Sequence, residues 1–454
     1  MPAPTSNRHL PPGPRMPKPV AGYVVLLNHI PTLKRLKRRY GDAFTVNLPV
    51  YGRTTIVSKP EYVKQMFTSK PGMLTFGEDN PLGDVLGPGS MFALEGAPHM
   101  RERKLLLPPF HGERMKSYES IIEEEALRQM ARWRPGEEFE TLPSFLHITL
   151  HAILRAVFGA EGQHERALAA RLPRLVKLGS PLTLVPWLAK DLGPLSPGGR
   201  FKRERRAYDQ IINAMIDEAL ADPQLDERSD VMALLLRTKY DDGEAMSRSA
   251  IADELLTLLA AGHETTATSL AWAVERLRRN PEVLARLQEE ARSDGKALRT
   301  ATVHEVQRTR PVITTIDRRV AVDEFELGEW RIPKGDRLFA CATLIHDDER
   351  FFERPHEFDP DRFVGRTPDT YTWIPFGGGT RRCIGAAFAQ MEMNIVLRTL
   401  LRDFDLVPTS EPDEKWRARG VAFAPAKGGR AVVRRVGRRA ATSKAAGATA
   451  QVAA

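Results

Sequence analysis

The chain has 454 residues, of which 42% are hydrophobic and 28% charged, a composition typical of a soluble globular protein. Its formal net charge of +9 is compatible with nucleic acid, a membrane surface or an acidic protein as partner. It contains no zinc-finger spacing, RNA-recognition signature or basic-aromatic interleaving, so we expect no nucleic-acid binding. Only two cysteines are present, which argues against a disulfide framework and suits a reducing cytoplasm. The apolar residues 20–30 fall short of the roughly twenty that a membrane span needs.

The two ends of the chain differ in composition from its middle. Residues 1–19 are rich in proline and are predicted to form an extended arm. Residues 426–454 consist mostly of Ala, Gly, Arg and Lys, which cannot bury enough apolar surface to fold. We therefore predict a disordered tail there and place the folded domain at residues 20–425.

A first candidate pair of functional residues follows a long loop rich in glycine and proline, residues 71–96. His99 and Arg103 lie four apart on a predicted helix and so share one face. On these residues alone, a solvated surface pair is the simpler interpretation.

The longest helical pattern covers residues 247–280 and ends before Pro281. Its middle carries a polar cluster, Gly262-His263-Glu264-Thr265-Thr266, in which glycine and threonine are poor helix formers. Such a cluster favours a kink or bulge, often found at functional sites, whereas a solvent-facing turn is the alternative. The apolar residues on both sides indicate a buried helix.

Residues 376–385 form the most informative stretch: a glycine-rich loop, two arginines and Cys383, directly before a helical pattern from about 386 to 404. The helix N-terminus and the arginines favour a thiolate at Cys383, which is either a nucleophile or a metal ligand. A buried core cysteine is the third possibility. A phosphate-binding loop is excluded because no Lys-Ser/Thr pair follows the glycines. The glycines leave room for a large flat group beside the sulfur, and Phe376 offers it an aromatic edge.

Phe376, Gly379, Arg381, Cys383 and Gly385 match all five defined positions of the pattern Phe-x-x-Gly-x-Arg-x-Cys-x-Gly. This pattern resembles the haem-binding signature of the cytochrome P-450 monooxygenases. The resemblance runs from about residue 10 to 425. It implies one mainly α-helical domain with small β-sheets (α+β), with haem b (iron protoporphyrin IX) buried between the central long helix and the cysteine-loop helix.

The resemblance also implies roles for single residues. Cys383 would be the proximal ligand of haem iron, and thiolate ligation favours O–O cleavage. The propionate-binding residues would be His99, Arg103, Arg318 and Arg381, with Arg319 leaving the register of Arg318 open. Ala261 and Gly262 would lie over the haem, Thr265 would hydrogen-bond the bound oxygen, and Glu264 would help to relay protons. Glu305, Arg308 and Arg362 resemble a buried structural trio that steadies the haem loop.

The implied activity is insertion of one oxygen atom from dioxygen into an apolar small-molecule substrate. Electrons would come from a separate ferredoxin or flavodoxin with its NAD(P)H-dependent reductase, docking near Arg103, Lys104, Arg381 and Arg382. We expect a cytoplasmic monomer with no membrane span. Two alternatives stay open, a peroxide-using haem-thiolate hydroxylase and a non-catalytic haem-binding sensor.

Overall fold

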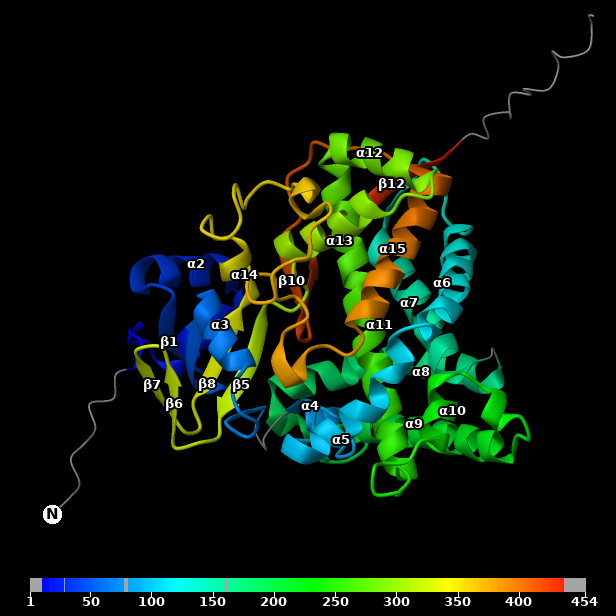
Figure 1. Cartoon of the computed structure of the whole chain (residues 1–454), viewed down its shortest axis with the longest axis horizontal. Helices are drawn as coiled ribbons and strands as arrows, with labels where there is room; N and C mark the ends of the chain where they lie inside the picture. Colours follow the sequence, from blue (N-terminus) through cyan, green and yellow to red (C-terminus); the bar gives the residue numbers. More distant parts are fainter. Residues whose placement is uncertain (1–9, 28, 77–80, 160–161, 437–454) are drawn as a thin grey trace, which may run out of the picture.

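The structure is a computed structural model that describes residues 10–27, 29–76, 81–159 and 162–436. Helices form most of it, with the five-stranded sheet gathered at one side (Figure 1). The α-helices are α1 (Lys18–Leu27), α2 (His29–Tyr40), α3 (Pro60–Phe67), α4 (Pro81–Leu86), α5 (Gly96–Leu106), α6 (Arg114–Met130), α7 (Thr141–Phe158), α8 (Gln163–Leu184), α9 (Pro197–Ala221), α10 (Val231–Arg237), α11 (Arg248–Arg278), α12 (Pro281–Ala291), α13 (Ala297–Thr309), α14 (Ala342–His346) and α15 (Ala386–Asp403). The predicted class, mainly α with small sheets, is confirmed.

The strands form four small sheets. They are β1 (Ala43–Leu48), β2 (Gly52–Val57), β3 (Leu74–Thr75), β4 (Glu138–Glu140), β5 (Thr315–Val320), β6 (Glu324–Leu327), β7 (Trp330–Pro333), β8 (Arg337–Cys341), β9 (Phe404–Leu406), β10 (Trp416–Arg419), β11 (Ala422–Pro425) and β12 (Arg430–Arg435). The largest sheet has the order β1-β2-β8-β5-β3, in which only β2 and β8 are parallel. Two hairpins, β6–β7 and β10–β11, stand as separate sheets, and β12 joins β4 to β9.

The helix α11 is the axis of the molecule. Ser247 caps its start, the Ser247 hydroxyl accepting from the Ala250 N–H at 3.2 Å. Most of its side chains are buried, because α7, α13 and α15 pack around it. The predicted helix over residues 247–280 is confirmed. The predicted bulge is wrong: residues 248–278 form one α-helix, although their polar side chains bond to carbonyls one turn back, as His263 Nδ1 does to the Leu259 carbonyl at 2.8 Å.

The helix α7 packs along α11 and belongs to the same core. Its 18 residues are apolar enough to cross a bilayer by length and composition, and no other described helix is. However, 72% of it is buried inside the protein. Burial of this kind is what the core helix of a folded domain requires.

The boundary of the folded domain lies further along the chain than the composition predicts. Arg430–Arg435 form β12, which pairs with β4 and β9 and buries Ala431 and Val433. The predicted tail from residue 426 is therefore wrong as far as Arg435, and residues 437–454 lie outside the described part. At the other end, residues 10–17 carry no helix or strand, α1 begins at Lys18, and residues 1–9 are likewise outside.

Candidate functional site

The cysteine loop owes its shape to two glycines in the left-handed region. Gly377 has φ +64° and Gly379 φ +66°. A Cβ on Gly379 would lie 2.3 Å from the backbone oxygen of Phe67, at the end of α3. The loop is also closed on itself, because the Cys383 N–H donates to the Phe376 carbonyl at 3.0 Å. Only glycine fits this close approach, and the approach fixes where the sulfur lies.

Cys383 stands just before α15, whose N-cap is Gly385. Both cysteines are free thiols, Cys341 buried and Cys383 exposed. Burial among protein atoms nevertheless raises the pKa of the Cys383 thiol, although the Gly385 N–H and the charges of Arg103 and Arg382 oppose this. An accessible sulfur that is still poorly solvated faces an internal space. Ligation of a metal would favour the thiolate form of this side chain.

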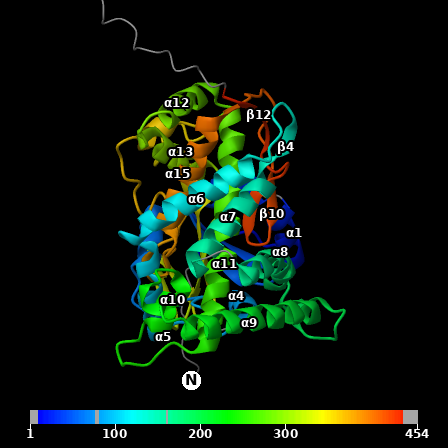
Figure 2. The same cartoon turned by 90° about the vertical axis from the view of Figure 1, so that its right-hand side faces the viewer.

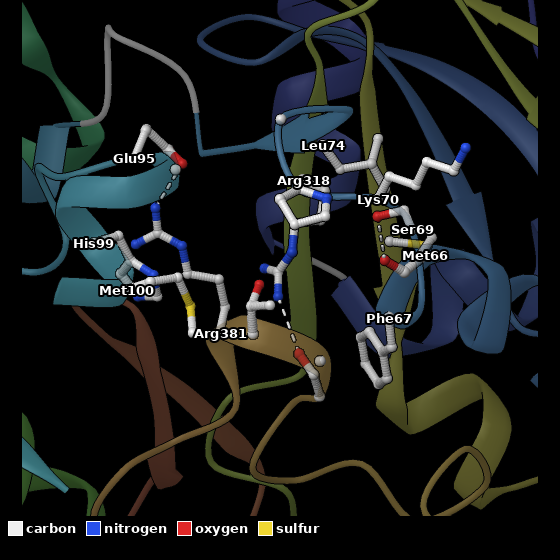
Figure 3. A pocket seen from close by; sticks show the side chains of 16 residues that line it. Met66, Phe67, Ser69, Lys70, Leu74, Glu95, His99, Met100, Arg318 and Arg381 are labelled. Carbon is white, nitrogen blue, oxygen red and sulfur yellow. Dashed lines mark hydrogen bonds and ion pairs between the residues drawn. The ribbon is translucent and has the colours of Figure 1, made fainter. Parts of the chain in front are cut away.

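Four cationic or potentially cationic side chains line one pocket beside this loop: Lys70, His99, Arg318 and Arg381 (Figure 3). His99 is only 2% exposed, and its Nε2 has no hydrogen-bond partner. Burial and the surrounding arginines lower the pKa of His99 to about 3. Burial and Arg381 likewise lower the pKa of Arg318 to about 10. Like charges brought together out of water fit a ligand that carries negative charge.

Two further residues shape this pocket and were missed by sequence reasoning. Glu95 accepts from Arg381 Nη2 at 2.5 Å and from the Phe76 N–H at 2.6 Å. The Phe76 ring lies 4.9 Å from the Arg381 guanidinium and 5.2 Å from that of Arg318, in cation–π range. Together they hold both guanidinium groups in place.

The two neighbouring arginines of β5 lie differently with respect to the pocket. Arg318 lines the pocket and donates to the Gly378 carbonyl at 3.4 Å, while Arg319 follows it and so points to the other face. Arg103 is not among the pocket residues; burial lowers the pKa of its guanidinium, with Arg381 and Arg382 adding to this and Cys383 opposing it. Phe376 is half-buried, its ring 5.9 Å from that of Trp373.

The middle of α11 is accessible although most of the helix around it is buried. Ala261 is exposed, and Gly262, Glu264 and Thr265 are half-buried. Ala261 and Thr265 lie one turn apart on one face, and the Thr265 hydroxyl donates to the Ala261 carbonyl at 2.8 Å. Because the rest of α11 is buried in the core, we infer that this accessible face borders a space inside the protein.

Glu264 does not stand alone on this face. Its Oε1 accepts from Nε of Arg419, at the end of β10. The adjacent Gly420 has φ +60°, and a Cβ there would lie 3.0 Å from Ser180 of α8. The β10–β11 turn thus links α8 to the polar centre of α11, and nothing in the sequence around Arg419 marks it as a partner of Glu264.

The predicted structural trio is confirmed as a contact network. Arg308 donates to both carboxylate oxygens of Glu305 at 2.7 Å, and Arg362 reaches Glu305 at 3.3 Å. Glu305 and Arg308 are 0% and 2% exposed. Arg308 also donates to three backbone carbonyls, those of His346, Pro355 and Glu357, so its charge is fully satisfied.

These observations together test which group the site fits. The accessible thiol of Cys383 offers a soft metal ligand. The glycine loop packs against Phe67 of α3, and His99, Arg318 and Arg381 offer donors to an anionic edge. A metal-bearing cofactor with carboxylates on one edge matches both the thiol and these donors.

Comparison with known proteins agrees with this. A family model described as "Cytochrome P450" matches residues 11–429. A Mycobacterium tuberculosis protein named "Putative cytochrome P450 138" is 52% identical over 434 residues, covering 96% of this chain and 98% of its own. Another, named "Putative cytochrome P450 137", is 37% identical over 399 residues, covering 87% and 84%.

Solved structures support the fold. "Retinoic acid bound cyanobacterial CYP120A1" superposes with a TM-score of 0.82 at 20% identity, covering 95% of this chain and all of that one. "Crystal structure of cytochrome P450DA heme domain" gives 0.81 at 21% identity, covering 94% and 98%. The fold and site define a haem-binding monooxygenase, an oxidoreductase that consumes dioxygen and takes electrons from a redox partner. The chain belongs to the cytochrome P450 family.

Proposed function

We propose that Cys383 ligates the haem iron and that His99, Arg318 and Arg381 hold the haem propionates. The free, accessible thiol at a glycine-shaped loop is the observation that carries this assignment. The unpartnered Nε2 of His99 supports the propionate assignment, since a carboxylate would supply its missing partner, and the two arginines add positive charge beside it. The positive charge of Arg103 would stabilise the thiolate of Cys383 and the negative charge of a propionate.

When bound, haem would supply the activation of dioxygen, and the residues of α11 would manage protons and space beside it. Ala261 and Gly262 present little side-chain bulk on the accessible face, which leaves room for a small ligand. The Thr265 hydroxyl, now donating to the Ala261 carbonyl, would turn to donate or accept a proton there. Glu264 would pass protons to this face once released from Arg419.

The substrate side of the site is proposed to be apolar. A Cβ on Gly179 of α8 would contact Val85 of α4 and Phe201 of α9, so these three helices pack tightly at this point, next to Ser180, which contacts the β10–β11 turn. Leu182 and Ala189 line the same region. The charged Asp84, Lys202, Arg205 and Arg206 line this region too, so its four apolar side chains would contact the apolar part of a small-molecule substrate that is hydroxylated.

The electron donor is proposed to be a ferredoxin or flavodoxin with its NAD(P)H-dependent reductase, acting on a cytoplasmic monomer. Arg103 and Arg382 support an acidic partner near Cys383, because both lie close enough to influence its charge. Two other members of the expected basic cluster contribute less. Arg381 is turned inward to Glu95, and Lys104 is paired with Asp241 at 2.7 Å.

The ligand assignment is tested by Cys383→Ala, with Cys341→Ala as the matched control because Cys341 is the other free cysteine. We expect Cys383→Ala to abolish the thiolate-type spectrum of the reduced carbon-monoxide complex, and Cys341→Ala to keep it. A thiolate spectrum that survives in Cys383→Ala would falsify the assignment.

A further inference from the structure

We propose that Glu95 is a positioning residue for the haem, which fixes the Arg381 guanidinium and sets how readily the bound haem accepts an electron. Glu95 is the N-cap residue of α5 and stands four residues before His99, beside the cysteine loop seen edge-on in the second view of the molecule (Figure 2). The inference deepens the haem-site assignment proposed above and rests on it.

The carboxylate of Glu95 uses each of its oxygens for a different segment of the chain. Its Oε2 accepts from Nη2 of Arg381 at 2.5 Å, and its Oε1 accepts from the Phe76 N–H at 2.6 Å. Figure 3 shows the carboxylate facing the guanidinium. Only 29% of the Glu95 side chain and 8% of the Arg381 side chain are exposed. A short ion pair withdrawn from water in this way is stronger than an ordinary surface pair.

Arg381 has two further acceptors, and both are neutral. Its Nη1 donates to the Met91 carbonyl at 2.7 Å, and its Nη2 also donates to the Leu94 carbonyl. Glu95 is therefore the only charged partner among the hydrogen bonds described for Arg381. Burial lowers the pKa of the Arg381 guanidinium, and Glu95 opposes this. Because the two carbonyls also hold the guanidinium, the charge of Glu95 can be removed separately from the geometry.

Glu95 also reaches the second arginine of the pocket through Phe76. Its hydrogen bond fixes the Phe76 backbone directly after β3, and the Phe76 ring lies 4.9 Å from the Arg381 guanidinium and 5.2 Å from that of Arg318. By contrast, the hydrogen bonds described for Arg318 go only to backbone carbonyls. One carboxylate thus orders the surroundings of both cations but offsets the charge of only one.

The charged side chains that line the pocket leave a defined excess. Three permanent cations, the exposed Lys70 and the more buried Arg318 and Arg381, stand against the single carboxylate of Glu95, which leaves two positive charges. His99 adds none at neutral pH, because burial and the arginines lower its pKa to about 3. Two positive charges match the two propionates of haem b. Without Glu95, one positive charge would stay unmatched beside the haem.

This charge balance acts on the reduction of the haem. Reduction adds one electron, so a nearby positive charge favours the reduced form and a negative charge favours the oxidised form. Charges act strongly over several ångströms where little water intervenes, as around the largely buried Arg381. Loss of the Glu95 charge should therefore shift the equilibrium towards the reduced form.

The test measures the midpoint potential of the haem-loaded full chain by spectroelectrochemical titration. Glu95→Gln keeps the length of the side chain and an acceptor for the Phe76 N–H but removes the charge. We expect its equilibrium constant for reduction to rise about tenfold, which corresponds to about 59 mV for one electron. Glu95→Asp keeps the charge and should stay closer to the parent protein. The same spectra give the haem content of each variant.

The matched control is Glu204→Gln on α9, which removes one negative charge from another arginine pair, Arg171 and Glu204 at 3.1 Å. Neither of these residues lines the pocket, so the potential should stay at that of the parent. Glu95→Ala is a second uncharged variant and should shift the potential in the same direction as Glu95→Gln.

An unchanged potential in Glu95→Gln, or an equal shift in Glu204→Gln, would overturn the inference. Loss of haem from both uncharged variants would overturn it too, since Glu95 would then have a structural role. These outcomes differ from failure of the haem-site assignment, which would appear instead as a thiolate spectrum that survives in Cys383→Ala.

Discussion

Arg419 donates from Nε to Oε1 of Glu264, joining the end of β10 to the accessible middle of α11. Glu264 is mostly buried, with its side chain 14% exposed, while that of Arg419 is 47% exposed. The ion pair therefore fixes a carboxylate at the site from outside the helix that carries it. A proton relay through Glu264 has to work with, or break, this contact.

We expect Arg419→Gln to keep haem but to couple reductant consumption to product less well. Without the cation the Glu264 carboxylate can reorient and draw water onto the face of α11, so more electrons should end in peroxide. We expect the peroxide formed per reductant consumed to rise several-fold. This effect should be smaller than the roughly hundredfold loss of rate that removal of a whole acid-base group can cause. The measurement uses a substrate found by screening for displacement of iron-bound water in the Soret band.

Arg419→Lys keeps a positive charge on a shorter, less directional group, so it should fall between the parent and Arg419→Gln. A purely structural role for Arg419 predicts otherwise. In that case both variants would lose stability and haem in parallel, with coupling unchanged in the protein that stays folded.

Thr265→Ala should leave haem content unchanged and divert electrons to peroxide, because it removes a hydroxyl from the accessible face of α11. Thr265→Ser restores the hydroxyl and should restore most of the coupling. The matched control is Thr268→Ala, since the Thr268 hydroxyl makes the same kind of contact, to the Glu264 carbonyl at 2.7 Å, but is fully buried. Equal uncoupling in both variants would show that the accessible position has no special role.

Gly379→Ala should lower the haem content and the melting temperature. The new Cβ would meet the Phe67 backbone oxygen at 2.3 Å, and φ +66° is strained for any other residue by about 1–3 kcal/mol. The loop would have to move away from α3 and carry Cys383 with it. The control is Gly162→Ala, at φ −165° with no atom within 4 Å of the new Cβ. If both variants bind haem as the parent does, the loop is not shaped by this contact.

Glu254, fully buried on α11, makes stability depend on pH. Burial raises the pKa of its carboxyl from 4.5 to about 9, opposed by the Met91 backbone and aided by Glu102 and Asp253. The folded protein therefore holds a proton that the unfolded chain releases above pH 4.5. Stability must then fall as pH rises from 4.5 towards 9, by at most about 1.4 kcal/mol per pH unit.

Glu254→Gln stays uncharged at every pH and should lose this slope. We expect the melting temperature of the variant to exceed that of the parent at pH 8.5 by more than it does at pH 6. Glu119→Gln, on the exposed surface of α6, serves as control and should follow the parent at both values. Parallel curves for parent and Glu254→Gln would show that Glu254 is already ionised in the folded protein.

Local patterns were enough to predict much of this molecule. The predicted helices over 247–280 and from about 386 to 404 correspond to α11 and α15, because helical periodicity and the flanking Ser247 and Pro281 are local signals. The position of Cys383 just before α15 follows from the same stretch. His99, Arg318 and Arg381 were named from a family resemblance, and the fold brings them into one pocket.

The contacts between distant segments were not predictable in this way. Glu95 and Arg381 are separated by 286 residues and Glu264 and Arg419 by 155, so no pattern in either segment indicates its partner. The end of the domain was misplaced for a related reason. In β12 only Ala431 and Val433 are fully buried, and three of its six residues are arginines. The strand therefore has the composition of a tail, and only its pairing with β4 and β9 identifies it as a strand.

That late strand has a consequence for biosynthesis. β12 pairs with β4, made almost 300 residues earlier, and the Thr141 hydroxyl at the start of α7 donates to the Gly429 carbonyl at 2.7 Å. Because translation runs from the N-terminus, β4 and α7 are synthesised long before β12, their partner, which is among the last segments made. Pairing of β12 with β4 and β9 is therefore one of the final steps of folding. A nascent chain that stops before codon 430 leaves the edges of β4 and β9 unpaired.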